Sequence, residues 1–325
     1  MTVGCRAVGL TPMETRRDVI VDMACTAERL GYEAFLLPEG WGYDSTVLLA
    51  EIATKTSEIT LVAGILSIWG RTPAQMAMAA STLQDVSGGR FVLGLGASTP
   101  LLAEGFHDVD FDRPAATLED ALVRVRALLN GDRAVLAEGR TARPLRLMTG
   151  AAEVPVWLGA LGPQTIDLAA RLADGWIPSC ASFDYLAGVR DGLEAVRSQA
   201  GVRDEPLLVV SGPVVSVGDQ STAEAVLAFY LCTMGEGYAD FVTAQGYGPE
   251  IAALKAANPK PSPTAGEFPD ESRVLLDQLM VSGQPDEVQA GLARWDEIVD
   301  VLYVGVPPGE PWESIEHRLE VCAPA

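Results

Sequence analysis

The sequence predicts an α/β fold, a single (β/α)8 TIM barrel domain with insertions that spans residues 1–325. Three observations favour this fold. Short β-like runs alternate with helical patterns eight times, in about the length that such a barrel needs. Runs such as Ile59–Ala63 are nearly continuously apolar, which is typical of parallel strands covered on both faces. A complete dinucleotide-binding fingerprint is lacking, which disfavours the competing open, doubly wound sheet.

The first four units have clear boundary signals. Their strands are expected at Val3–Gly9, Ala34–Leu37, Ile59–Ile65 and Phe91–Leu95, and their helices at Glu14–Leu30, Ser45–Thr56, Pro73–Val86 and Leu118–Leu129. Apolar residues recur at helical spacing through the first helix, and Gly31 follows it as a stop signal. Ser45 is expected to cap the second helix, and Pro73 suits the first turn of the third.

The last four units repeat the alternation less sharply. Their strands are expected at Val154–Leu158, Gly175–Pro178, Leu207–Val217 and Val301–Val306, and their helices at Gln164–Leu172, Tyr185–Gln199, Thr222–Leu231 and Trp312–Val321. Two insertions interrupt the rhythm, at about residues 131–153 and 235–272, and the second leads into helical stretches at Glu271–Met280 and Pro285–Trp295. Insertions of this length in barrels usually form functional loops or lids.

Composition and charge exclude several function classes. The chain has 48% hydrophobic residues, 23 basic residues and 44 acidic residues, for a formal net charge of −21. This charge repels phosphate backbones and anionic lipids, so we expect neither nucleic acid nor a membrane surface as a partner. The sequence has no apolar run of about 18 residues that would predict a membrane span. Its N-terminal stretch lacks signal-peptide features, and we therefore expect a cytoplasmic protein.

The scarcity of reactive side chains points to an organic cofactor. Two histidines, His107 and His317, make a Ser-His-Asp site or a multi-histidine metal site improbable, and no metal is expected. The five cysteines are widely spaced and form no CxxC motif, so we expect unpaired thiols that serve as small core residues in a reducing compartment. Any catalysis is expected to borrow its reactivity from a cofactor.

Two glycine-containing turns follow predicted strands. Gly94–Ser98 ends the fourth strand, which indicates either a tight turn or the close approach of a flat ring or a phosphate to the backbone. Gly159–Thr165 follows the fifth strand and opens a helix, whose free N–H groups would attract a phosphate. Because every βα junction has such groups, an ordinary connection is the alternative.

Polar and aromatic side chains gather after the second and third strands. Glu39 could transfer a proton or hydrogen-bond a cofactor, or it could act only as a local cap. Trp41 and Trp69 lie at the same predicted mouth of the barrel. Arg71 is explained more readily by a salt bridge across the rim than by an anion contact. For His107, a structural role and a cofactor contact are equally good explanations.

Together these segments resemble the luciferase-like monooxygenase superfamily, and within it the coenzyme F420-dependent (deazaflavin) oxidoreductases. The resemblance is strongest over about residues 28–180. It is carried by Gly64-Ile65, Arg71-Thr72-Pro73, Leu83–Phe91, Leu93–Ser98, Glu104–His107, Phe111–Pro114, Ala160–Pro163, Leu172–Trp176 and Gly283–Val288. Each stretch is common by itself, and the combination is specific.

The resemblance implies a bacterial luciferase-like barrel, often dimeric, with a cofactor ring over the strand mouths. A homodimer is therefore expected. The ring would be lined by Gly64, Ile65, Gly96, Ala97 and Ser98, and the phosphate held by Gly159, Ala160, Leu161, Gly162, Pro163, Gln164 and Thr165. A non-prolyl cis peptide behind the ring would fall near Gly64-Ile65. The expected members of the substrate pocket are Trp41, Trp69 and His107.

Departures from the family pattern bear on the cofactor and the proton donor. Flavin-dependent relatives place an arginine near Ala97, so the resemblance favours coenzyme F420 over FMN. Many relatives have a histidine at the position of Gly40, and its absence leaves Glu39 as the nearer candidate for proton transfer. Gln164 stands where a basic residue is common, which would shift the phosphate contacts toward backbone N–H groups.

We therefore expect an oxidoreductase that transfers a hydride between coenzyme F420 and an organic small-molecule substrate, with Glu39 handling the proton. Two alternatives stay open. One is an FMN-dependent monooxygenase that uses O2, and the other is a catalytically silent barrel that binds a flavin or a partner subunit. The apolar residues at the mouth favour an apolar or aromatic substrate.

Overall fold

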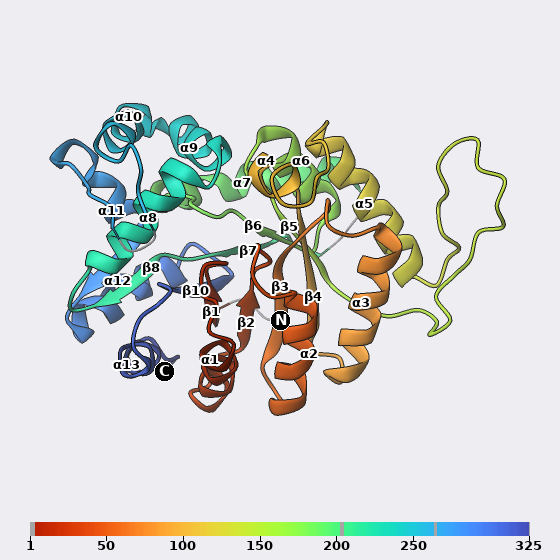
Figure 1. The fold of residues 1–325 in the computed structure, drawn as a ribbon, viewed down its shortest axis with the longest axis horizontal. Helices are drawn as coiled ribbons and strands as arrows, with labels where there is room; N and C mark the ends of the chain where they lie inside the picture. Colours follow the sequence, from red (N-terminus) through yellow and green to blue (C-terminus); the bar gives the residue numbers. More distant parts are fainter. Residues whose placement is uncertain (1–3, 202–204, 263–264, 325) are drawn as a thin grey trace.

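The computed structural model describes residues 4–201, 205–262 and 265–324. Eight parallel strands form a closed barrel in which β7 is followed by β10, and β10 pairs back onto β1 (Figure 1). The barrel strands are β1 Cys5–Leu10, β2 Ala34–Leu37, β3 Thr60–Ser67, β4 Phe91–Gly96, β5 Val156–Gly159, β6 Gly175–Ile177, β7 Leu208–Ser211 and β10 Val301–Val306. The prediction of a (β/α)8 barrel is confirmed.

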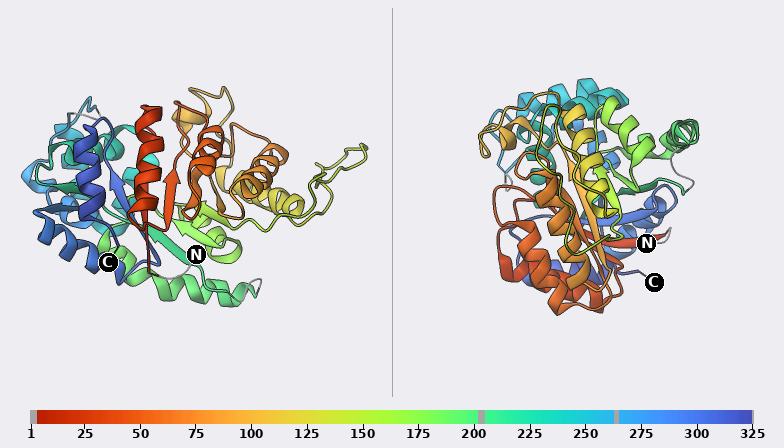
Figure 2. Two further views of the ribbon diagram at one scale, coloured as in Figure 1. Left: turned by 90° about the horizontal axis from the view of Figure 1, so that it is seen from below. Right: turned by 90° about the vertical axis from the view of Figure 1, so that its right-hand side faces the viewer.

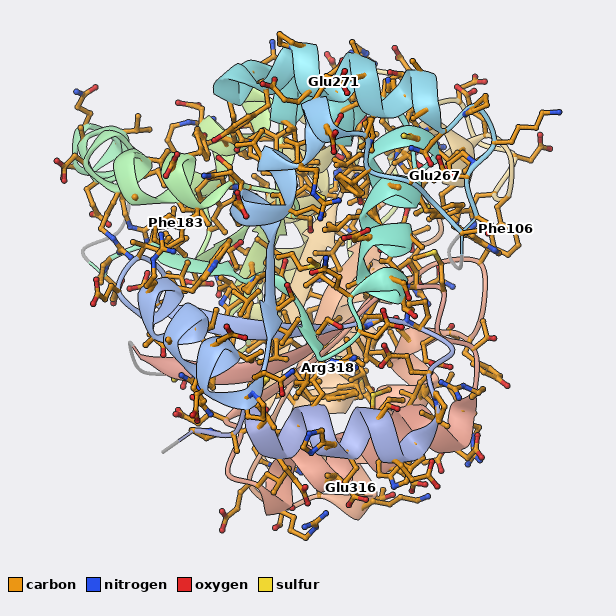
Figure 3. All side chains as sticks on the ribbon, turned by 90° about the vertical axis from the view of Figure 1, so that its left-hand side faces the viewer. Phe106, Phe183, Glu267, Glu271, Glu316 and Arg318 are labelled. Carbon is orange, nitrogen blue, oxygen red and sulfur yellow. The ribbon has the colours of Figure 1, made fainter. Side chains whose placement is uncertain are left out.

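Helices surround the barrel and cover its outer face (Figure 2). They are α1 Arg17–Arg29, α2 Ser45–Lys55, α3 Pro73–Val86, α5 Pro114–Leu129, α6 Pro163–Leu172, α7 Phe183–Ala200, α8 Ser221–Thr233, α12 Pro285–Asp296 and α13 Trp312–Val321. On α13, the buried Arg318 and Glu316 lie on opposite sides of the helix (Figure 3), and Glu316 pairs with Arg29 of α1 at 3.0 Å. All the helices predicted for the eight units are present, with ends shifted by a few residues.

The barrel itself has two apolar layers, as expected for a barrel that is covered by helices. Inside the barrel, alternate strand residues pack together, among them Val62, Trp157 and Val301. Between barrel and helices lies a larger layer that includes Phe35 and Trp176. The near-continuous apolar character of the strands follows directly, since both faces of each strand are buried.

The predicted strand Leu207–Val217 is wrong in its extent. It splits into β7 and β8, the latter Val214–Val217, and β8 leaves the barrel to pair with β9, Met280–Gly283. Pro213 has no N–H to donate to a ladder. A Cβ at Gly212 would lie 1.9 Å from the backbone oxygen of Tyr303, so the chain passes β10 too closely to continue as a regular strand.

The predicted helix Glu271–Met280 is wrong in part. The segment forms a 3-10 turn, η2 Asp270–Ser272, then helix α11 Val274–Leu279, and it ends in the unpredicted strand β9. The pairing partner of β9 is β8, which lies inside the predicted strand Leu207–Val217, whereas β9 itself was not predicted.

The two predicted insertions differ in structure. Residues 131–153 contain no helix or strand and form an arm that extends away from the barrel (Figures 1 and 2). Residues 235–272 are largely helical, with α9 Glu236–Val242, the π-helical turn η1 Thr243–Tyr247 and α10 Gly248–Ala257. With the short α4, Pro100–Ala103, these helices lie above one end of the barrel (Figure 1). Within the described ranges, no helix is both long and apolar enough to cross a membrane.

Candidate functional site

A large cavity opens at the carboxyl ends of the barrel strands, where (β/α)8 enzymes carry their active sites. Its volume is about 660 Å³. All of the residues predicted for cofactor binding line it, together with two further predicted residues: Gly64, Ile65, Gly96, Ala97, Ser98, Gly159, Ala160, Leu161, Gly162, Pro163, Gln164, Thr165, Glu39 and Trp41. The structure thus brings together predicted residues from the ends of four strands, β2, β3, β4 and β5.

The floor of the cavity is formed by the Ile65 side chain, which lies across β4 and β5. A Cβ at Gly96 would lie 2.9 Å from Cδ1 of Ile65, and a Cβ at Gly159 would lie 3.1 Å from its Cγ2. The two glycines therefore make room for a side chain of the protein, in addition to lining the cavity. The peptide bond between Gly64 and Ile65 is cis, as the resemblance implied.

One end of the cavity meets the N-terminus of α6. Gly162 is the N-cap residue of α6, and no side chain caps the first N–H groups of this helix. The first backbone hydrogen bond of the helix runs from the Ile166 N–H to the Gly162 oxygen, at 2.9 Å. The N–H groups of Gln164 and Thr165 precede that bond and are the donors that a helix leaves unsatisfied at its start. The cavity-lining residues of the described chain include no lysine, arginine or histidine.

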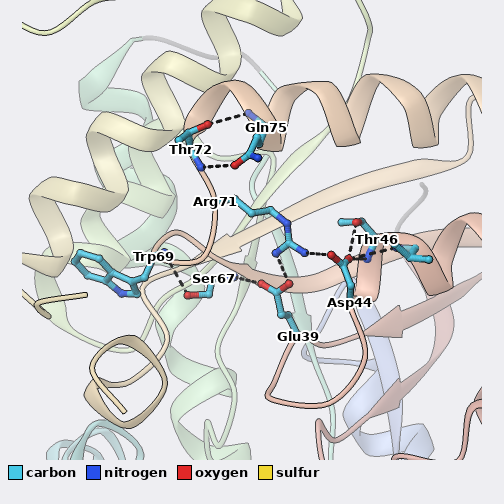
Figure 4. A network of polar contacts seen from close by, with 9 residues as sticks. Glu39, Asp44, Thr46, Ser67, Trp69, Arg71, Thr72 and Gln75 are labelled. Carbon is cyan, nitrogen blue, oxygen red and sulfur yellow. Dashed lines mark hydrogen bonds and ion pairs between the residues drawn. The ribbon is translucent and has the colours of Figure 1, made fainter. Parts of the chain in front are cut away.

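An ionic network borders the cavity at the ends of β2 and β3 (Figure 4). Arg71 forms ion pairs with Glu39 and, at 2.8 Å, with Asp44. The other oxygen of Glu39 accepts a hydrogen bond from the Ser67 N–H at 3.0 Å. Burial alone would lower the pKa of Arg71, but the hydrogen bond from Arg71 to Glu39 and the two carboxylate charges raise it. The prediction of a salt bridge for Arg71 is confirmed.

The cap of α2 is one residue earlier than predicted. Asp44, and not Ser45, accepts hydrogen bonds from the N–H groups of Thr46 at 2.9 Å and Val47 at 3.3 Å. Glu39 has no part in this cap. Its carboxylate is instead placed between Arg71 and the backbone of β3, at the wall of the cavity.

Two predicted pocket residues lie behind the cavity wall. Neither Trp69 nor His107 is among the residues that line the cavity. The Trp69 indole donates a hydrogen bond of 2.6 Å to the backbone oxygen of Ala97, and so ties the end of β3 to the end of β4. His107 packs over Gly70, where an added Cβ would lie 2.7 Å from its ring. Its buried Nε2 has no hydrogen-bond partner among the described residues.

Comparison with known proteins matches this arrangement to one family. The family model described as luciferase-like monooxygenase matches residues 1–300. The chain belongs to the luciferase-like monooxygenase family. It is accordingly an enzyme of this family of oxidoreductases, as the sequence predicted.

Relatives of known sequence or structure agree with this assignment. A Mycobacterium tuberculosis protein provisionally named coenzyme F420-dependent oxidoreductase is 29% identical over 309 residues, which are 85% of this chain and 86% of the relative. An F420-dependent tetrahydromethanopterin reductase from Methanopyrus kandleri has a similar structure, with a TM-score of 0.73 at 18% identity over 99% of this chain and 98% of its own. An F420-dependent secondary alcohol dehydrogenase, in complex with an F420-acetone adduct, gives a TM-score of 0.71 at 18% identity over the same shares.

The part of this luciferase-like site that sequence reasoning missed comes from α8 and α9. Tyr230, Met234 and Tyr238 all line the cavity, as does Ser179 after β6. Tyr230 lies on α8, Met234 is the C-cap of that helix and Tyr238 lies on α9, at a spacing of four residues along the sequence. That spacing was the available signal. It was obscured because Gly235 and Gly237 made the segment resemble a loop.

Proposed function

We propose that the chain is an F420-dependent oxidoreductase, which transfers a hydride between the deazaflavin and a small organic substrate. We favour F420 over FMN because no lysine, arginine or histidine is among the described residues that line the cavity. FMN ends in a phosphate monoester with a charge near −2 at neutral pH. The phosphate of F420 is a diester with a single charge. A helix N-terminus supplies only about half a positive charge, which suits the diester better.

The residues at the mouth fit such a cofactor. The N–H groups of Gln164 and Thr165 would hold the phosphate, and Ile65 would support the ring from below. When bound, the deazaflavin supplies or accepts a hydride. The chain itself supplies the apolar surface of Ile65 for the ring and the N–H groups at the start of α6 for the phosphate. The names of the relatives, among them the F420-dependent reductase and alcohol dehydrogenase, support this proposal at the level of the family.

The role of Glu39 stays a prediction, and the geometry supports positioning more than proton transfer. Both of its oxygens are bonded, one to Arg71 and one to the N–H of Ser67. We propose that Glu39 holds the end of β3, and with it Ile65, in place below the ring.

Equilibrium titration of the purified protein with F420 and with FMN tests the proposal. Fluorescence quenching should report tight binding of F420 and weak binding of FMN. A matched variant, Gln164→Lys, adds a cation at the phosphate end and should improve the affinity for FMN more than that for F420. Tight binding of FMN alone, with oxygen consumption on reduction, would overturn the proposal in favour of a monooxygenase. Binding of neither would favour the silent barrel.

We also propose that the arm at residues 131–153 joins two copies of the chain into a homodimer. The arm exposes Leu145 by 72% and Met148 by 99%, which is unfavourable in water unless another surface covers them. It carries four arginines against three acidic residues, in a chain with 44 acidic and 23 basic residues. An acidic second copy is therefore the electrostatically matched partner.

A further inference from the structure

A much smaller cavity lies behind one wall of the large cavity. Its volume is about 20 Å³. Pro12, Pro38 and Gly40 line both spaces, so the loops that follow β1 and β2 form the wall between them. On its other side the small cavity reaches the first turn of α2, where Ser45 and Leu48 line it.

Two buried hydroxyl groups of residues that line this small cavity have no hydrogen-bond partner in the described part of the chain. Ser45 is 1% exposed, and its Oγ is one of these unpartnered atoms. The other is Oγ1 of Thr11, the first residue after β1. Native proteins rarely bury a hydroxyl group without a partner, because the group loses its hydrogen bonds to water. Both atoms therefore indicate a polar ligand in the space between the two loops.

The carboxylate that lines the cavity cannot serve as this partner. One oxygen of Glu14 accepts hydrogen bonds from the backbone N–H and from Nε of Arg16, each at 2.9 Å. The other oxygen accepts from Nη2 of Arg16 at 2.6 Å and from the N–H of Gly309 at 3.0 Å. A carboxylate offers about four acceptor positions, and those of Glu14 are all engaged. The two hydroxyl groups thus need a partner from outside the chain.

The size and the chemistry of the cavity select a single water molecule. A water needs about 10–15 Å³ of such space and two to four polar partners, so a cavity of about 20 Å³ holds one and no more. Water has two donors and two acceptors, and it can therefore bond to both hydroxyl groups at once. A Ca²⁺ or Mg²⁺ ion would require about six oxygen ligands, whereas the unengaged side-chain oxygens here are the two hydroxyls.

We propose that this cavity holds one resident water, which bridges Oγ of Ser45 and Oγ1 of Thr11 and fixes the loop after β1 to the loop after β2. The two loops also touch directly, since a Cβ at Gly40 would lie 2.6 Å from Cβ of Pro12. The water thus supports from behind the wall that Pro12 and Gly40 form in the large cavity. This inference does not depend on which cofactor the large cavity binds.

The bridging water connects two polar networks at the mouth of the barrel. On one side, Asp44 caps α2 next to Ser45 and pairs with Arg71 after β3 (Figure 4). On the other side, Glu14 in the loop after β1 accepts from Gly309 in the loop after β10. With the water in place, hydrogen bonds and ion pairs extend around the mouth from the loop after β3 to the loop after β10.

The first test is a high-resolution crystal structure of the wild-type protein. It should show a density peak within about 3.2 Å of both hydroxyl oxygens. The double variant Thr11→Val, Ser45→Ala removes both hydroxyl groups with little change in shape, and its structure should lack this peak. Density for a direct bond between either hydroxyl and the protein, with no peak between them, would overturn the inference. An anomalous signal at the peak after a rubidium soak would also overturn it, in favour of a monovalent cation.

The second test measures the effect of the water on the loop in solution. The N–H of Glu39 donates to the Ile65 oxygen at 3.1 Å, so its hydrogen exchange reports opening of the loop after β2. In the double variant this exchange should be about fivefold faster, the factor that corresponds to one lost hydrogen bond. Thr56→Val is the matched control, because it removes a buried hydroxyl that bonds to the Ile52 oxygen at the far end of α2. Equal exchange in wild type and double variant would show that no water holds the loop.

Discussion

Glu39 and Arg71 form a largely buried ion pair that joins the end of β2 to the loop after β3. Their side chains are 6% and 15% exposed, and Arg71 extends the link to Asp44 at the start of α2. Water is mostly excluded from the pair, so each charge depends on the other. The network also fixes Ser67, two residues beyond Ile65, and thereby holds the floor of the proposed cofactor site.

Removal of one partner of this pair is expected to destabilise the fold strongly. Arg71→Met leaves Glu39 buried without its counter-charge and should cost about 3 kcal/mol in the free energy of unfolding. Glu39→Gln should cost less, because the amide still accepts from the Ser67 N–H. The double variant should be more stable than Arg71→Met alone. Urea unfolding of the four proteins measures the coupling, and strictly additive effects would show that the pair is not coupled.

Gly96 is expected to control the affinity for the cofactor through Ile65. In Gly96→Ala the new Cβ would lie 2.9 Å from Cδ1 of Ile65, so the Ile65 side chain, which lines the cavity, must shift. We expect about tenfold weaker F420 binding, equivalent to ~1.4 kcal/mol. Ile65→Val removes Cδ1 and should restore affinity in the double variant.

Gly188→Ala provides the matched control for this experiment, because nothing lies within 4 Å of a Cβ at that position on α7. Fluorescence titration should give wild-type affinity for this variant. A loss of affinity in Gly96→Ala that Ile65→Val does not rescue would mean that the glycine contacts the cofactor directly.

Asp44 is expected to stabilise α2 in a pH-dependent way. Burial raises its pKa, but hydrogen bonds from Thr46 and Val47 and the charge of Arg71 outweigh burial, so the pKa is lowered overall. Its contribution is therefore fully present above the ordinary Asp pKa of about 3.9, and it is lost as the pH falls through the lower folded value. Asp44→Ala should cost about 1 kcal/mol at pH 7. Urea unfolding should find this difference reduced at pH 3, whereas the exposed Asp240→Ala should have little effect at either pH.

The arm is expected to determine the oligomeric state. Leu145→Ser combined with Met148→Ser removes its two most exposed apolar side chains, and light scattering should then report monomers at concentrations where the wild type is a dimer. Because the proposed contact is also ionic, high salt should shift the wild type in the same direction. A serine variant that stays dimeric would assign the interface to another surface.

The fold was predictable because each barrel unit carries its own local signals. Strands such as Ala34–Leu37 are short apolar runs, and helices such as Pro73–Val86 begin and end at cap residues. The split at Pro213 was less accessible. Proline and Gly212 were visible in the sequence, but the close approach of the Tyr303 backbone that prevents a continuous strand is a tertiary contact.

The candidate site was predictable where it follows the ends of β3, β4 and β5, since those turns carry the residues that resemble the family. Trp69 and His107 lie near it in sequence, yet their side chains turn away from the cavity to Ala97 and Gly70. The opposite wall comes from α8 and α9, more than 60 residues after β5 along the chain. Only the closed barrel brings Tyr230 to the same space, so its spacing of four residues from Met234 could not by itself assign it to the site.

A crystal structure of the protein with bound F420 tests the central claim most directly. The account predicts the ring over Ile65 and the phosphate within hydrogen-bond distance of the N–H groups of Gln164 and Thr165. A phosphate bound elsewhere, or a ring that does not lie over Ile65, would contradict the account.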